Sequence, residues 1–158
     1  MKRLPDLPLE LKVLATAALI YGGLAILMGF TYIVASHHGA SDSAYVGVSD
    51  IAALYTGPGV GIVSLISLAH IHLLGLFAVF TIIGFIFVHS TLATGWKIFL
   101  SVLPYAAFLI DETGGFLTMF VAPGFVYQVI LGGAVFIMSL GLMILISLYQ
   151  LWLVKPRP

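Results

Sequence analysis

The stretch VGIVSLISLAHIHLLGLFAVFTIIGFIFVHSTL at residues 60–92 contains no Asp, Glu, Lys or Arg. A hydrocarbon core of about 30 Å is crossed by roughly 20 apolar residues of α-helix, and this run exceeds that requirement. Its apolar residues are continuous, whereas the strands of a membrane barrel alternate apolar and polar positions. The run therefore predicts a membrane-spanning helix.

Three further apolar runs and the overall composition extend this prediction to the whole chain. Of the 158 residues, 61% are hydrophobic and 8% are charged, and the mean hydropathy is +1.19. These values lie far from those of soluble domains. Backbone polar groups in lipid must be satisfied within the protein, which favours helices here. We expect an all-α integral membrane protein, a single four-helix bundle over residues 1–158, with spans at approximately 13–36, 60–92, 98–121 and 124–154.

The basic residues predict the orientation of the bundle. With four crossings, all six fall on one side of the membrane, and the positive-inside rule makes that side the cytoplasm. We therefore expect both termini in the cytoplasm, as in a bacterial inner-membrane protein. The outer face then carries a loop at 37–60, in which Ser49 to Tyr55 predict a short surface helix. The basic residues are Lys2, Arg3, Lys12, Lys97, Lys155 and Arg157.

Two histidines, His70 and His72, interrupt the second apolar run. At 100° per residue they lie about 200° apart around a helix, so an intact helix cannot direct both to one small ion. One can face the bundle while the other faces a different helix pair or a partner subunit. Such a pair can serve two cofactors that flank one helix. The alternative is ordinary interhelical hydrogen bonding.

Asp111 and Glu112 are the only charged residues inside a predicted span. A helix rise of about 1.5 Å per residue from Lys97 puts Asp111 in the outer half of the membrane, at roughly the depth of the two histidines. Ionisable groups cost a few kcal/mol there, which favours a functional role such as orienting a ligand, binding metal or carrying protons. The alternative is that the third helix breaks at Gly114-Gly115 and leaves both carboxylates hydrated.

The remaining histidines are further candidate ligands. His37 and His38 follow the first span on the outer side, and His89 lies near the cytoplasmic end of the second. The chain contains no cysteine, which excludes disulfides, thiolate metal sites and covalently attached haem. A metal would therefore be held by His70 or His72, with His37, His38 and His89 as additional candidates.

Part of the second span resembles a known family. Ala69-His70-Ile71-His72, followed by Ala78-Val79-Phe80 and Phe87-Val88-His89, is similar to the tenth helix of haem–copper oxidase subunit I. In that family the H-x-H supplies one axial ligand to each of two haems. The chain also resembles small four-span membrane proteins with A/T-H-x-H in the second helix and an aspartate in the third. His70, His72 and Asp111 are the corresponding positions.

These observations predict a redox protein. We expect a membrane subunit that binds b-type haem near the outer face through His70 and His72, with Asp111 nearby. It would transfer electrons between quinol and an extracytoplasmic partner, within a respiratory complex of other membrane subunits. One alternative is a non-catalytic accessory subunit, and another is a copper or other metal site that uses histidine and Asp111. The zero net charge and the six basic residues disfavour nucleic-acid binding.

Overall fold

The computed structural model of the chain describes residues 3–38, 47–58 and 60–157, without the side chains of residues 33–38. Every regular element in these ranges is helical. Of the helices in the described ranges, four are long and apolar enough to cross a membrane, which confirms the predicted all-α, four-helix membrane fold. In chain order the elements are η1 (Leu4–Asp6), α1 (Leu9–His38), α2 (Val48–Thr56), α3 (Ile62–Phe87), α4 (Thr94–Phe120), η2 (Pro123–Phe125) and α5 (Val126–Trp152).

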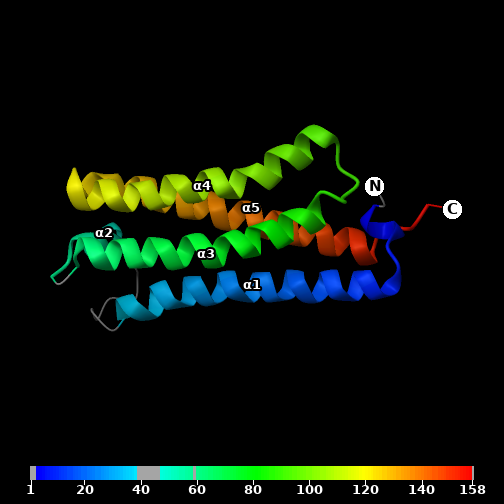
Figure 1. The fold of residues 1–158 in the computed structure, drawn as a ribbon, viewed down its shortest axis with the longest axis horizontal. Coiled ribbons are helices and arrows are strands. Elements are labelled where there is room, and N and C mark those ends of the chain that lie inside the picture. The colour runs from blue at the N-terminus through cyan, green and yellow to red at the C-terminus, as the bar shows by residue number, and fades with distance from the viewer. Residues whose placement is uncertain (1–2, 39–46, 59, 158) are drawn as a thin grey trace.

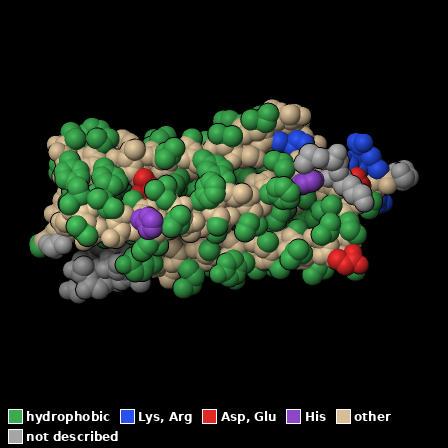
Figure 2. Space-filling model, viewed as in Figure 1, with side chains coloured by type: hydrophobic (Ala, Val, Ile, Leu, Met, Phe, Trp, Pro, Cys, Tyr) green, Lys and Arg blue, Asp and Glu red, His purple; other side chains and the backbone are tan. Residues whose placement is uncertain are grey.

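The helices α1, α3, α4 and α5 run side by side along the long axis of the molecule (Figure 1). Both chain ends lie at one end of this bundle, as an even number of crossings requires, and α2 lies toward the opposite end. Hydrophobic side chains are spread along the whole visible flank, whereas the Lys and Arg side chains gather at the end with the termini (Figure 2). The flank is therefore suited to lipid contact.

The bounds of the helices reflect local turn chemistry. α3 ends at Phe87, before the predicted limit of 92, because the next residues form a turn in which Ser90 N donates to Phe87 O at 2.8 Å. α2 begins one residue earlier than Ser49, and its first turn is closed by Gly47 N donating to Asp50 Oδ2 at 2.7 Å. A side-chain acceptor for an otherwise unpaired amide stabilises such a helix start.

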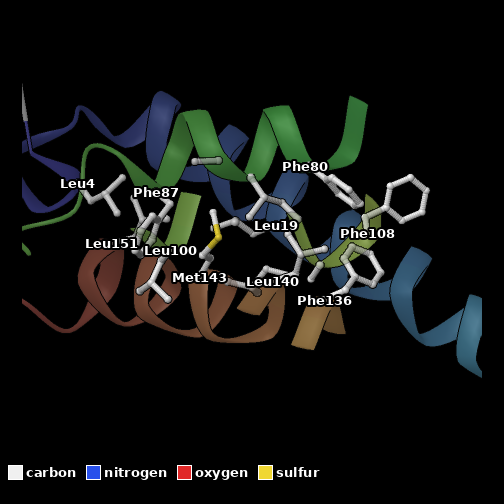
Figure 3. Close-up of a cluster of buried hydrophobic side chains, with 14 residues drawn as sticks. Leu4, Leu19, Phe80, Phe87, Leu100, Phe108, Phe136, Leu140, Met143 and Leu151 are labelled. Carbon is white, nitrogen blue, oxygen red and sulfur yellow. The ribbon is translucent and has the colours of Figure 1, made fainter. Parts of the chain in front are cut away.

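The core of the bundle is a band of large apolar side chains contributed by all four long helices. Leu19 of α1, Phe80 of α3 and Leu140 of α5 are almost completely buried. Figure 3 shows these residues directed toward one another, together with the Met143 thioether. Because lipid is as apolar as this core, close packing is the main source of helix association in a membrane.

Glycine allows α4 and α5 to approach closely. A Cβ atom at Gly132 would lie 2.6 Å from Asp111 N and 2.9 Å from Ala107 O, both on the backbone of α4. On the other side of the contact, a Cβ at Gly114 would lie 2.9 Å from Val129 N. Gly132 is therefore a close-packing position, and the contact fixes the part of α4 that carries the carboxylates.

Hydrogen bonds between distant segments close the bundle at the end with the termini. Gln150 Oε1 accepts from Thr91 N at 2.7 Å, and Leu4 N donates to His89 O at 2.9 Å. Trp152 Nε1 donates to Thr16 Oγ1 at 2.9 Å, which joins α5 to α1. The connection between α3 and α4 is thus held against both the N-terminal turn and the last helix.

Candidate functional site

One histidine and one carboxylate inside the bundle meet between α3 and α4. His72 Nδ1 lies 3.0 Å from Glu112 Oε1, a hydrogen-bonding distance. The Glu112 side chain is 15% exposed and that of His72 is 42% exposed, so the carboxylate is covered while the imidazole keeps an open side. The chain thus brings together a histidine and a carboxylate that are 40 positions apart in sequence.

Helix geometry explains why these two residues meet. Phe108 precedes Glu112 by one turn of α4, so both project from the same face of that helix. The Phe108 ring lies edge-on to the His72 ring, with 6.5 Å between ring centroids. The His72–Glu112 pair is therefore supported by an aromatic contact that lies one turn earlier along α4.

The contact with Glu112 determines what the His72 ring can do. A carboxylate accepts hydrogen bonds only, so Nδ1 carries the proton when Glu112 is ionised and His72 is neutral. The other ring nitrogen, Nε2, then has a free lone pair. That lone pair can accept a proton or bind a metal ion, and the carboxylate stabilises the imidazolium or orients the ligand accordingly.

His70 occupies a different side of α3. It is exposed, while its neighbour in sequence Ala69 is buried against the bundle. The separation of about 200° between the two histidines therefore directs His72 toward α4 and His70 outward, to lipid or to a neighbouring protein. The structure does not bring His70 into the His72–Glu112 site.

Asp111 faces a different neighbour from Glu112. Its Oδ1 lies 3.9 Å from the position that a Cβ would take at Gly133, so the half-buried carboxylate is directed toward α5. On the same turn, Gln128 Nε2 of α5 donates at 3.0 Å both to Ile110 O and to Thr113 Oγ1. The segment of α4 with the carboxylates is therefore anchored to α5 by hydrogen bonds as well as by glycine contacts.

Tyr55 completes the site, and the sequence reasoning missed it. Its ring packs on Gly115, where a Cβ would lie 2.5 Å from Tyr55 Cε1. Burial of the hydroxyl raises the pKa of Tyr55, and the carboxylates of Asp111 and then Glu112 raise it further. The ring of this α2 residue thus lies close to both carboxylates, and the neutral phenol is the favoured form.

The same contact corrects one alternative considered above. α4 does not break at Gly114-Gly115 but continues to Phe120, and both glycines are buried. Gly114 accommodates the backbone of α5, and Gly115 accommodates the ring of Tyr55. These glycines are therefore packing positions, and nothing in the sequence spacing linked Tyr55 of α2 to them.

Among the other candidate ligands, only His89 has a side chain that the structure describes. His89 lies just beyond α3 at the end with the termini, where its ring contacts Phe85 with 5.7 Å between centroids. The side chains of His37 and His38 lie outside the described residues. Within the described ranges, no three or more His, Asp or Glu side chains form a group suited to a metal ion.

An apolar cavity of about 200 Å³ lies between α3 and α4, and one of its wall residues, Phe108, also contacts the His72 ring. Phe80 is almost fully buried at its base, whereas Phe77 is 58% exposed at its rim, so the cavity opens on the lipid-facing flank. We call it the α3–α4 cavity. Its walls are Leu73, Phe77, Phe80, Tyr105, Phe108 and Leu109.

Comparison with known proteins agrees with the membrane fold. A family model described as a transmembrane helical domain matches residues 60–158, more than half of the chain. No curated protein and no solved structure matches the sequence. The matched range contains α3, α4 and α5, and therefore His72, Asp111 and Glu112.

Proposed function

Because this chain belongs to that family of transmembrane helical domains, we propose that it acts within the bilayer as a redox subunit of a membrane complex. It passes electrons from quinol to haem b near the outer face, and from there to an extracytoplasmic partner. The observation that carries this proposal is the 3.0 Å contact between His72 Nδ1 and Glu112 Oε1. An imidazole–carboxylate pair within a lipid-spanning segment is costly enough to favour a role in proton or electron transfer.

Quinol oxidation needs a proton acceptor as well as an electron acceptor. Conversion of a quinol to a quinone breaks two O–H bonds and releases two protons and two electrons. A haem b would supply the one-electron acceptor for each of the two electrons, and the accompanying proton would each time be accepted at His72 Nε2. The carboxylate of Glu112 stabilises the resulting imidazolium until its proton is released to water on the outer side.

The geometry favours different roles for the two histidines. Cavities that enclose ligands of moderate size usually have volumes of about 300 Å³ or more, and the cavity of about 200 Å³ between α3 and α4 has less space than a porphyrin requires. His70 is exposed on the flank of α3. We therefore propose that His70, at a boundary with a neighbouring subunit, would hold haem b, and that His72 would transfer protons.

Orientation follows from the charges. The Lys and Arg side chains gather at the end of the bundle where both termini lie (Figure 2). The positive-inside rule supports a cytoplasmic location for that end in a bacterial inner membrane, with His72 and Glu112 in the outer half. Released protons then reach the outer side, the direction expected of a respiratory quinol-oxidising complex.

The test compares three variants of the chain in the purified membrane complex. His70→Ala is expected to remove the haem b band from the reduced-minus-oxidised spectrum. His72→Ala is expected to retain that band but to lose quinol-dependent haem reduction, and His89→Ala serves as the control with both properties intact. Metal analysis of the same samples identifies the element present.

Three outcomes would overturn the proposal. A complex with copper and no iron assigned to this subunit would favour the alternative metal site. Loss of the haem band in His72→Ala with retention in His70→Ala would reverse the two roles. Impaired assembly of both variants, with unchanged cofactor content in the complex that does assemble, would favour a non-catalytic accessory subunit.

A further inference from the structure

The short helix α2 lies toward the end of the bundle opposite the termini (Figure 1). None of its nine residues is fully buried, whereas α3, α4 and α5 each have several buried side chains. It contacts α4 through the Tyr55 ring, which packs on Gly115. Segments with few buried side chains open at a lower free energy than the core, so α2 can leave the bundle while the long helices stay together.

The Tyr55 ring covers the turn of α4 that carries Asp111. Gly115 follows Asp111 by one turn, so the two positions share a face of the helix. A ring seated on Gly115 therefore lies one turn nearer the end of the bundle than Asp111. Burial of the hydroxyl, and then the charge of Asp111, raise the pKa of Tyr55, which agrees with this placement. α2 thus lies between Asp111 and that end of the molecule.

The surroundings of Asp111 make access of water important. Glu112 is bonded to His72, whereas Asp111 is half-buried and directed toward Gly133 of α5. A glycine has no side chain that can donate a hydrogen bond, and an ionised carboxylate is costly to bury without donors. The charged form of Asp111 therefore depends on water, and the position of α2 controls how much water reaches it.

The contact between α2 and α4 can yield without a change in the bundle. A Cβ added at Gly115 would lie 2.5 Å from Cε1 and 3.1 Å from Cδ1 of Tyr55, atoms near the end of a rotatable side chain. By contrast, a Cβ added at Gly114 would lie 2.9 Å from the backbone atom Val129 N. A side chain at position 115 therefore displaces the ring, whereas one at position 114 must separate α4 from α5.

From these features we propose that α2 is a cover that controls access of water to Asp111, with Tyr55 seated on Gly115 in the closed state. In the open state the ring leaves Gly115 and α2 separates from α4, while the four long helices keep their packing. Protons exchanged between Asp111 and water at this end of the molecule pass while α2 is open. The inference goes beyond the redox proposal, because it requires neither haem nor quinol.

The test uses the absence of cysteine from the sequence. Gly133→Cys introduces a single thiol near Asp111, at a position where an added Cβ meets no atom closer than 3.9 Å. The full chain is placed in lipid nanodiscs, which expose both ends to water, and the rate of labelling by a charged methanethiosulfonate reagent is measured. Thr56→Cys, at an exposed position of α2, is the control for a thiol that needs no opening.

Further substitutions in the Gly133→Cys chain locate the cover. Tyr55→Ala removes the ring and Gly115→Ala displaces it. Each is expected to raise the labelling rate about tenfold, because the burial of one large side chain changes an equilibrium constant by about that factor or more. The two together should be no faster than either alone, since both remove the same contact. Leu54→Ala, at the exposed neighbour of Tyr55, is the matched control and should leave the rate unchanged.

Hydrogen exchange, which needs no added cysteine, distinguishes a moving cover from a fixed hole. In Tyr55→Ala the amides of α2 should exchange faster by the same factor as the labelling, while those in the centres of α4 and α5 should not change. Unchanged labelling in Tyr55→Ala and Gly115→Ala would overturn the inference, and so would faster labelling without faster exchange in α2, or faster exchange throughout the bundle. A chain that behaves as a covered bundle in a complex without haem would refute only the redox proposal.

Discussion

Substitution of Gly132 by alanine tests the packing that positions the site. The added Cβ would lie 2.6 Å from Asp111 N and 2.9 Å from Asp111 Cα, both backbone atoms that cannot rotate away. Ordinary van der Waals contact for a Cβ begins at 3.4 Å, so α4 and α5 must separate by something close to an ångström. The expected result is a less stable bundle.

Two opposing effects determine the magnitude. Alanine is favoured over glycine in a helix by about 1 kcal/mol, which applies equally at Gly132 and at Gly141 of the same helix. Nothing lies within 4 Å of a Cβ placed at Gly141. Overpacking typically costs about 1–3 kcal/mol, so Gly132→Ala should be less stable than Gly141→Ala by about that amount.

The assay is reversible unfolding of the purified chain in mixed micelles of mild detergent and dodecyl sulfate, followed by helical circular dichroism. Gly141→Ala should equal or exceed the unmodified chain in stability, and Gly132→Ala should fall below both. Equal stability of the two variants would show that the contact between α4 and α5 is looser than described, and the argument for a fixed Asp111–Glu112 segment would fail.

Two further substitutions test other parts of the molecule. Gln150→Leu removes the acceptor that the Thr91 amide has at 2.7 Å. It should lower the free energy of unfolding by about 1–3 kcal/mol. Trp152→Phe, which removes a hydrogen bond at a partly exposed contact, should lower the free energy of unfolding by less in the same assay. The pKa of Tyr55 is raised above its ordinary value of 10.0, so its contribution to stability is present below pH 10 and declines as the unfolded chain loses the phenolic proton above it. The melting temperature should therefore fall more between pH 8 and pH 11 in the unmodified chain than in Tyr55→Phe, and an equal fall in both would contradict the placement of Tyr55 near the carboxylates.

The membrane fold could be predicted because it depends on properties of single segments. The run at 60–92 is apolar along its entire length, so it identifies a spanning helix without knowledge of its neighbours. The rotation of this helix about its own axis could not be predicted in the same way. Ala69 is buried and Ile71 is 67% exposed, although both are apolar, because lipid and core impose the same hydrophobic requirement.

The candidate site could be predicted only in part for the same reason. The angle between His70 and His72 follows from one helix, but the identity of the residue opposite His72 depends on how α3 and α4 pack. Tyr55 depends on a still more distant relation, since its position follows from the absence of a side chain at Gly115. The spacing of residues along the chain does not indicate which ring packs on a distant glycine.

The two adjacent carboxylates have separate surroundings, and this separation gives them separate chemistry. Glu112 faces α3 and is bonded to His72, so its charge acts directly on the imidazole. Asp111 faces α5 and lies near Gly133, and its charge acts on Tyr55 more strongly than that of Glu112 does. Neutralising Glu112 should therefore change the acceptor nitrogen of His72, whereas neutralising Asp111 should chiefly change the environment of α2. A helix that turns about 100° per residue thus places two identical functional groups in two different sites with one step along the chain.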